Sequence, residues 1–149
     1  MKKTTHALDR QRAIYLGGAA GLRPIIPLDP ALLEQRARAR MSPEGYAYIA
    51  GGAGLERTVA ANRSDFDRWS IVPRMLRNVE NRDTSIDFFG QKIPAPLFLA
   101  PIGVLEMAHP AADLAVAQAA GDLGIPYIFS NQASVPMEPC AAAMGDTPR

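Results

Sequence analysis

The sequence PLFLAPIGV, residues 96–104, is a short apolar run that ends abruptly at Pro101 and Gly103. It is followed by MAHP, residues 107–110, which has the composition of a helix start. A buried parallel strand has this pattern when its C-terminal end presents backbone to a ligand and the chain then continues into a helix. Residues 96–100 are therefore predicted to form a buried strand of an α/β fold.

The same order of elements is repeated once further along the chain. An alanine-rich helix is expected over 110–123, ended by Gly124, and a second buried strand is expected over 126–130. A second helix is expected over 136–144, closed by Gly145. Strand, helix, strand and helix in this order predict parallel strands, because helices of this length are the usual crossover connections.

Residues 1–28 are predicted to form an N-terminal arm that precedes a domain of residues 29–149. Glycines at 17, 18 and 21 and prolines at 24 and 27 argue against a stable element in the arm. The domain is expected to begin with a helix at Asp29-Pro30, since aspartate is a favoured N-cap and proline is favoured at the first helical position. This helix is expected to end at about Arg40.

Two shorter helices and a small β cap are expected before the first buried strand. The helices are predicted over 43–49 and about 55–66, the second with Val59, Ala60 and Phe66 partly buried. Residues 85–90 alternate between polar and apolar side chains, as a half-exposed strand does, and 91–93 is the candidate hairpin partner.

Composition excludes several classes of protein. The chain has 149 residues and a formal net charge of +1, which argues against a nucleic-acid partner. Arg36, Arg38 and Arg40 are interpreted as a solvated helix face. No run reaches the roughly 20 apolar residues of a membrane span, and the N-terminus lacks the apolar core of a secretory signal. A soluble cytoplasmic protein with no membrane partner is expected.

Few side chains suit acid–base or nucleophilic chemistry. The single cysteine, Cys140, lies before three alanines and is predicted to be a small core residue, since a catalytic thiol needs a nearby histidine. The two histidines are His6 and His109. Because His109 precedes Pro110 at an N-cap position, a structural role is favoured over that of a general base. The sequence assigns no metal site and no catalytic residue.

Several separate runs resemble the family of FMN-dependent 2-hydroxy acid oxidases and dehydrogenases. They occur in order over about residues 29–149: YIAGGA at 48–53, Asn62-Arg63 with Phe66, PRML at 73–76, AP at 95–96, LAPIG at 99–103 and MAHP at 107–110. Each run alone is a weak signal, and their order and spacing make the resemblance specific. The glycine pair at 51–52, the PRML run and the APIGV run at 100–104 look nearest to the lactate 2-monooxygenase branch.

The resemblance implies the N-terminal part of a TIM (β/α)8 barrel, with a helical arm and a small β cap before the first barrel strand. It also implies that FMN is held at the C-terminal ends of the strands. Pro101, Ile102 and Gly103 match the turn whose backbone lies against the flavin, where glycine permits close approach of a flat ring. Ser130 matches a hydroxyl near the flavin, and Asn131 departs from the second small hydroxyl residue often found there. A strand-ending turn and an ordinary strand-end serine, without a ligand, are the alternatives.

Tyr48 matches the family's substrate-binding tyrosine, whose hydroxyl reaches the carboxylate of a 2-hydroxy acid; a buried aromatic on a short helix is the alternative. The family's catalytic histidine, arginine and lysine lie much further along the chain, and Arg74 and Arg77 are not given their roles. The resemblance thus implies oxidation of a small L-2-hydroxy acid such as lactate, with electrons passing to FMN and then to oxygen. Complete members are expected to be homo-oligomers.

Residues 146–149 are interpreted as a loop that leads into a third strand. The chain is therefore expected to be the N-terminal part of a longer protein, inactive by itself and a weak binder of FMN at most. Two other interpretations stay open. One is a non-catalytic truncated remnant or interaction fragment. The other is a different flavin barrel, for instance an isomerase acting on a diphosphate, which needs arginine and lysine anion sites.

Overall fold

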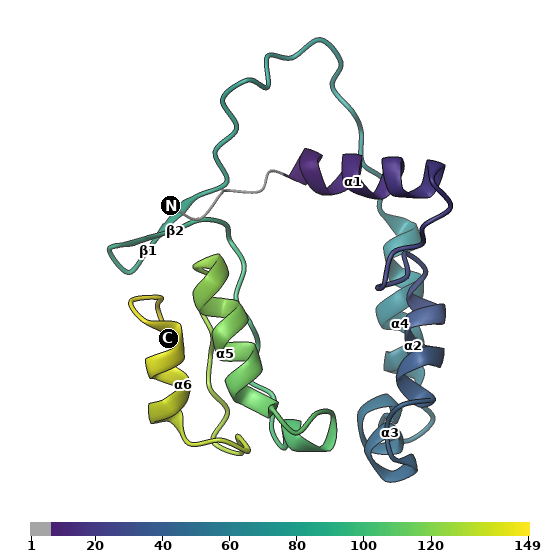
Figure 1. Ribbon diagram of the computed structural model, residues 1–149, viewed down its shortest axis with the longest axis vertical. Coiled ribbons are helices and arrows are strands. Elements are labelled where there is room, and N and C mark those ends of the chain that lie inside the picture. The colour runs from purple at the N-terminus through teal and green to yellow at the C-terminus, as the bar shows by residue number, and fades with distance from the viewer. Residues whose placement is uncertain (1–6) are drawn as a thin grey trace. The chain divides into compact units, whose positions relative to one another are not determined.

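The structure is a computed structural model that describes residues 7–149 (Figure 1). The chain divides into two compact units, one ending at Ala47 and the other running from Tyr48 to Arg149. This division differs from the predicted boundary between residues 28 and 29, which separates an arm from a domain by composition and stays a prediction. The two units are described one at a time.

The first unit contains α1 (Ala7–Ala19), α2 (Pro30–Arg38) and the start of α3 (Pro43–Ala50). The helix start at Asp29 is confirmed, because its carboxylate accepts a hydrogen bond from the backbone N–H of Ala31 at 2.9 Å. The expectation of no stable element before residue 28 is wrong. Residues that favour helices fill α1 up to Leu16. Glycine destabilises a helix interior by about 1 kcal/mol, but in α1 it occurs only in the last turn.

Tyr46 ties α3 to α2 within the first unit. Its phenol donates a hydrogen bond to a carboxylate oxygen of Glu34 at 2.9 Å, and the Arg38 guanidinium lies 5.4 Å from the centre of its ring. The hydrogen bond to Glu34 is the main reason that the pKa of Tyr46 is raised. Tyr46 is therefore engaged in structural contacts, unlike the tyrosine two positions later.

The second unit begins with the end of α3, followed by α4 (Arg57–Ser64) and a 3-10 turn over Asp65–Arg68. The predicted helices are present, but the expected partial burial of the second one is wrong for its large side chains. Val59 and Phe66 are 47% and 76% exposed, and α4 buries no residue. A helix buries its apolar face only where another element covers that face, and α4 has no such cover in this unit.

The predicted β cap is confirmed as a hairpin of β1 (Ile86–Phe88) and β2 (Gln91–Ile93). The strands pair antiparallel with Ile86 opposite Ile93. The connecting residues Phe89 and Gly90 both have positive φ, 50° and 76°, as a tight two-residue hairpin turn requires. Along β1, Ile86 and Phe88 are half-buried and the residue between them is exposed, which confirms the predicted alternation.

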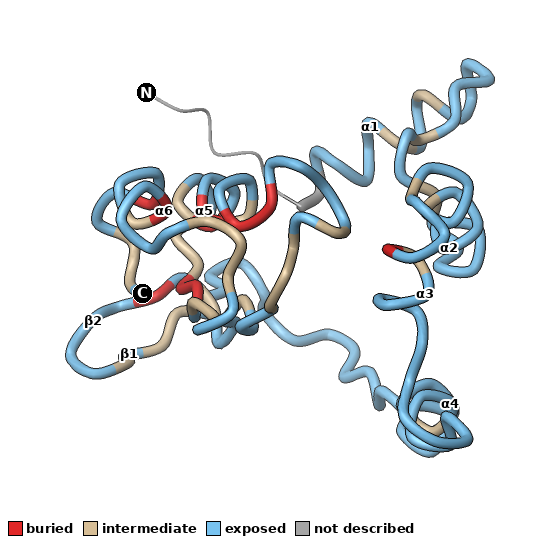
Figure 2. The backbone as a smooth tube through the Cα atoms, turned by 90° about the horizontal axis from the view of Figure 1, so that it is seen from below, coloured by how far each residue is buried: buried red, intermediate tan, exposed pale blue. Residues whose placement is uncertain are grey.

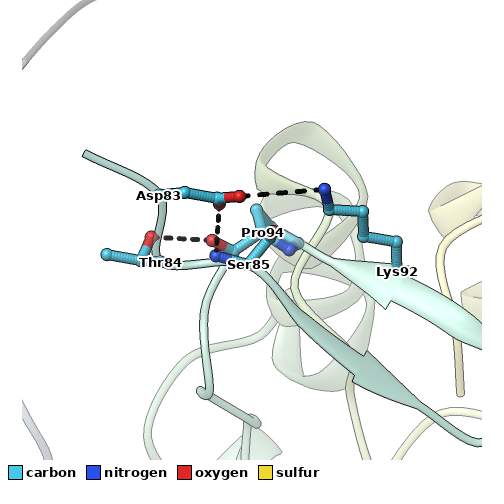
Figure 3. Close-up of polar contacts among 5 residues, drawn as sticks. All are labelled: Asp83, Thr84, Ser85, Lys92 and Pro94. Carbon is cyan, nitrogen blue, oxygen red and sulfur yellow. Dashed lines mark hydrogen bonds and ion pairs between the residues drawn. The ribbon is translucent and has the colours of Figure 1, made fainter. Parts of the chain in front are cut away.

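Polar contacts fasten the two ends of this hairpin (Figure 3). The Asp83 carboxylate accepts the backbone N–H of Ser85 at 2.8 Å and lies 3.8 Å from the Lys92 ammonium. The hydroxyl of Thr84 donates to the carbonyl of Pro94 at 2.8 Å. The bonds to Ser85, with a smaller contribution from Lys92, lower the pKa of Asp83.

The two predicted strands, over 96–100 and 126–130, form only one parallel bridge, between Leu99 and Tyr127, and neither range becomes a full strand. These two residue ranges are called the first strand and the second strand. The N–H of Leu99 donates to the carbonyl of Pro126 at 2.9 Å, and its carbonyl accepts the N–H of Ile128 at 3.1 Å. The expectation that residues 96–100 are buried is wrong. Leu97 and Phe98 are 58% and 36% exposed, because a parallel strand is buried only where layers cover both of its faces.

The C-terminal residues of the chain lie beside Tyr127, on the edge of the second strand opposite Leu99. The N–H of Tyr127 lies 3.4 Å from the carbonyl of Pro148. Backbone groups of successive residues in a strand point to opposite edges, so Pro148 lies on the far side of the second strand from the first.

The core of this unit lies between the strand pair and two helices, α5 (Ala112–Leu123) and α6 (Met137–Met144). Figure 2 shows buried residues on both helices. The buried cluster consists of Ala117, Ala120, Tyr127, Cys140 and Met144. Gly124 and Gly145 end the helices with positive φ, as predicted. A Cβ at Gly121 would lie 3.0 Å from the backbone of α6, so glycine permits the close helix contact.

Candidate functional site

Two loops follow the paired strand ends and are bonded to one another. They are the first-strand turn, residues 101–104, and the second-strand loop, residues 130–135. The N–H of Val104 donates to the carbonyl of Gln132 at 2.9 Å, and the N–H of Glu106 donates to the hydroxyl of Ser134 at 3.1 Å. Since parallel strands end at the same edge, the structure brings three predicted cofactor residues of the turn close to the loop that begins with Ser130.

Gly103 lies close to the second-strand loop. A Cβ at this position would lie 3.0 Å from the Cβ of Gln132 and 3.2 Å from its side-chain oxygen. The next residue, Val104, has φ of 53°, a conformation that is an outlier for a β-branched side chain. The backbone therefore keeps a strained turn here, of the kind found at ligand-binding sites. Pro101 and Ile102 are exposed beside it.

Ser130 is half-buried at the start of the second-strand loop. Its hydroxyl oxygen accepts the N–H of Gln132 at 3.1 Å, which leaves the hydroxyl hydrogen available as a donor. A cavity of about 380 Å³ lies over this loop, with Phe129, Ser130, Asn131 and Val135 among its lining residues. Cavities of this size with a few polar groups on an apolar wall are typical of small-molecule sites. Of the predicted cofactor residues, Ser130 lines this cavity, whereas Pro101, Ile102 and Gly103 do not.

Asp113 is a buried acid that is bonded to the second-strand loop and that the sequence pattern did not single out. Its carboxylate is fully buried, although it lies in the first turn of α5, where an acidic residue is ordinarily explained by the helix dipole. One oxygen accepts the Tyr127 hydroxyl at 3.0 Å. The other accepts the N–H groups of Ser134 and Val135 at 2.8 and 3.1 Å. The pattern HPAAD contains no signal that this acid, rather than Glu106, is buried.

Tyr127 and Cys140 are buried beneath the two loops. Burial and the hydrogen bond to Asp113 raise the pKa of Tyr127, so its phenol stays protonated and acts as a donor. Burial raises the pKa of the Cys140 thiol as well. The prediction that Cys140 is a small core residue is confirmed, because its side chain is fully buried in the core cluster.

His109 lies two residues before Ala111, the N-cap of α5, so its predicted N-cap position is wrong, but it makes a structural contact there. Its ring nitrogen Nδ1 accepts the backbone N–H of Ala111 at 3.1 Å, just before α5 begins. The histidine is exposed. Its contact thus favours the structural role over that of a general base.

Tyr48 lies on α3 as the first residue of the second unit and is 59% exposed. The alternative of a buried aromatic is therefore wrong, and the substrate-binding role stays a prediction. Within residues 7–149, no group of three or more His, Cys, Asp or Glu side chains is arranged to hold a metal ion. In the same range, none of the helices combines the length and the apolar character needed to cross a membrane.

Comparison with known proteins identifies the family. A sequence model of FMN-dependent dehydrogenases matches residues 37–149. An FMN-dependent alpha-hydroxy acid dehydrogenase of Penicillium citrinum is 41% identical over 134 residues, which are 89% of this chain and 33% of that protein. An L-lactate oxidase of Lysinibacillus sphaericus is 44% identical over 110 residues, 73% of this chain and 28% of that protein.

Solved structures agree with the sequence relatives. The crystal structure of mandelate oxidase matches with a TM-score of 0.70 and 40% identity, and the match covers 76% of this chain and 33% of that one. A mandelate oxidase variant holding an FMN adduct matches with a TM-score of 0.70 and 39% identity, over 75% of this chain and 34% of that one. The chain spans about a third of the length of the curated relatives it matches. It belongs to the family of FMN-dependent dehydrogenases, oxidoreductases that use FMN as their cofactor.

Proposed function

We propose that this chain takes part in the FMN-dependent oxidation of a small, lactate-like L-2-hydroxy acid, with electrons passing to the flavin and then to oxygen. The observation that carries the proposal is the pair of bonded loops at the ends of two parallel strands, beside a cavity of about 380 Å³. We place these strands as the first two of a TIM barrel, whose sites lie at this end of the strands. The curated relatives include hydroxy acid dehydrogenases, lactate oxidases and a 4-hydroxymandelate oxidase.

The residues of the two loops have separate roles in this proposal. FMN, when bound, supplies the two-electron acceptor for hydroxy acid oxidation. The backbone of Pro101, Ile102 and Gly103 lies against one face of the ring, since the glycine leaves no side chain in the way. The Ser130 hydroxyl donates a hydrogen bond to a polar atom at the edge of the ring, because its own oxygen already accepts from Gln132.

Tyr48 is the residue proposed to bind the substrate. Its hydroxyl donates a hydrogen bond to the carboxylate of the hydroxy acid. Catalysis also needs a base that removes a proton from the substrate. His109 is not proposed for that role, since its Nδ1 accepts the N–H of Ala111. We propose that the 149 residues alone do not turn over a hydroxy acid.

Within the family, we favour the lactate 2-monooxygenase or oxidase type. The support is the glycine pair at 51–52 and the runs PRML at 73–76 and APIGV at 100–104. Oxygen is then the electron acceptor, and the complete assembly is a homo-oligomer. We also propose a cytoplasmic location, which the single cysteine supports because it forms no disulfide within the chain.

The flavin site is tested by incubating the purified chain with FMN and recording the visible spectrum after gel filtration. We expect weak co-elution that Gly103→Val and Ser130→Ala both reduce. Gly18→Ala is the matched control, because a Cβ there has no neighbour within 4 Å. Flavin that co-elutes equally with all variants would contradict the assignment of these residues.

The reaction is tested by fusing residues 1–149 to the remaining two-thirds of the L-lactate oxidase relative. We expect the hybrid to bind FMN and to consume oxygen with L-lactate, and Tyr48→Phe to raise KM for lactate more than it lowers kcat. A hybrid that is folded and yellow but inactive with lactate and other 2-hydroxy acids would contradict the proposed reaction.

A non-catalytic interaction piece is the second candidate function. It is favoured by the apolar side chains of Trp69, Ile71, Val72 and Leu76, which are 83%, 95%, 83% and 104% exposed. Apolar residues gathered this closely on a surface mark a contact with another chain or segment. A colourless chain and an inactive hybrid would favour this second function over the first.

A further inference from the structure

Asp113 is the fully buried charged side chain of the described residues, and the proposed reaction gives it no role. A buried carboxylate is costly unless donors satisfy it. Here both oxygens are occupied, one by the Tyr127 hydroxyl and the other by two backbone N–H groups. The hydrogen bonds therefore offset the cost of burying the Asp113 carboxylate.

The donors connect three parts of the second unit. Asp113 lies in the first turn of α5, and Tyr127 lies on the second strand. Ser134 and Val135 end the second-strand loop before α6. Hydrogen bonds to a carboxylate are roughly twice as strong as those between neutral groups. The loop that carries Ser130 is thus fixed at its far end to the helix that follows the first strand.

The same contact reaches the first-strand turn through Ser134. Its N–H is held by Asp113 at 2.8 Å, and its hydroxyl oxygen accepts the N–H of Glu106 at 3.1 Å. Two residues earlier, the carbonyl of Gln132 accepts the N–H of Val104 at 2.9 Å. A displacement of Ser134 would therefore disturb both loops of the candidate flavin site.

We infer that Asp113 is a positioning residue of the flavin site. Its carboxylate fixes the second-strand loop so that Ser130 and the 101–104 turn keep one geometry before a ligand binds. The inference rests on the proposed function for the identity of the ligand, and Asp113 acts through the loop because both of its oxygens are already occupied. Preorganised loops bind more tightly because less ordering is needed when the ligand arrives.

The wild-type chain gives the first test, by residue-resolved amide hydrogen exchange in NMR without added FMN. The N–H groups of Ser134 and Val135 lie in a loop, yet we expect them to exchange at least about tenfold more slowly than unstructured amides. Exchange at the unstructured rate would overturn the inference, and this measurement needs no variant to fold.

Four variants separate positioning from general stability. Asp113→Ala removes both oxygens, and we expect at least about tenfold faster exchange at Ser134 and Val135. Asp113→Asn should restore most of the protection, because its oxygen accepts the two amides while its NH₂ donates to the Tyr127 oxygen. Tyr127→Phe removes only the hydroxyl and should leave the loop amides protected. Val116→Ala trims the same helix and core without touching the carboxylate.

Flavin affinity is measured in the same variants by quenching of FMN fluorescence. We expect Asp113→Ala to weaken binding at least about tenfold more than Val116→Ala does, with Asp113→Asn close to wild type. Equal loss in Asp113→Ala and Val116→Ala would overturn the positioning role. If the wild-type chain binds no FMN, the proposed flavin site fails in this chain, and the amide exchange alone then decides whether Asp113 fixes the loop.

Discussion

The segment that contains α5 and α6 and the segment over residues 57–80 belong to the same unit but differ in what they bury. In the first segment, small side chains such as Ala117, Ala120 and Cys140 are fully buried. In the second, Trp69 and Ile71 are large and apolar, yet they are 83% and 95% exposed. The difference shows that hydrophobicity alone does not make a core. Two elements must approach closely, and small residues permit that approach between α5 and α6.

The largest effect on stability is expected from truncating a buried side chain between α5 and α6. Met144→Ala should lower the free energy of unfolding by about 3 kcal/mol, because it leaves a cavity among Ala117, Tyr127 and Cys140. Trp69→Ala removes a larger side chain that is 83% exposed, and its expected cost is within about 0.5 kcal/mol. Urea unfolding followed by circular dichroism measures both. Equal losses would mean that Trp69 is buried in solution and that the contrast is wrong.

A smaller loss of stability is expected from adding a methyl group where α5 and α6 are in close contact. The Cβ introduced by Gly121→Ala would lie 3.0 Å from the Cα of Met144 and from the carbonyl of Ala143. Backbone atoms cannot move aside as a side chain can, so the cost should be about 2 kcal/mol. Gly18→Ala in α1 is the matched control and should be neutral or slightly stabilising. A thermal melt with Gly121→Ala at or above the wild-type midpoint would show that α5 and α6 are further apart.

The corresponding change in the site should affect binding more than stability. The Cβ introduced by Gly103→Ala would lie 3.2 Å from the side-chain oxygen of Gln132, which is able to move aside, and 3.0 Å from the Cβ of Gln132, which requires a backbone shift of only a few tenths of an ångström. We therefore expect a stability loss below about 1 kcal/mol, accompanied by weaker retention of FMN in the proposed complex. Flavin fluorescence titration and urea unfolding of the same samples give the two numbers. A large loss of stability with unchanged FMN binding would place Gly103 in the core rather than at the ligand.

The smallest effect is expected at the exposed contacts of the β cap. The pKa of Asp83 is lowered from its ordinary value of 3.8, chiefly by the bond from Ser85. The ionised form is thus favoured in the folded state, so the stabilisation is present above pH 3.8 and is lost as the pH falls below that value. Hydrogen exchange of the Ser85 amide should be faster in Asp83→Ala than in wild type at pH 6. The difference should disappear in strong acid, and a difference that grows there would reverse the assigned sign.

Local sequence determined where the helices and the hairpin begin and end. Asp29-Pro30 starts α2, and Gly124 and Gly145 end α5 and α6, because capping and positive φ depend on the residue itself. The predicted hairpin at 86–93 formed for the same reason. Helix α1 does not follow from this local pattern, because the glycines of its last turn obscure the helix formers that precede them.

Tertiary contacts decided which of these elements are buried and which side chains form the site. Nothing in the sequence distinguished the exposed Phe66 from the buried Tyr127, since burial depends on whether a second layer covers the face. The apolar pattern of the sequence placed Pro101, Ile102, Gly103 and Ser130 at the ends of predicted strands, and the family resemblance implied their contacts with the flavin. Only the fold showed that Asp113 holds the loop beside them, because its partners at Tyr127, Ser134 and Val135 are far along the chain and meet it through packing.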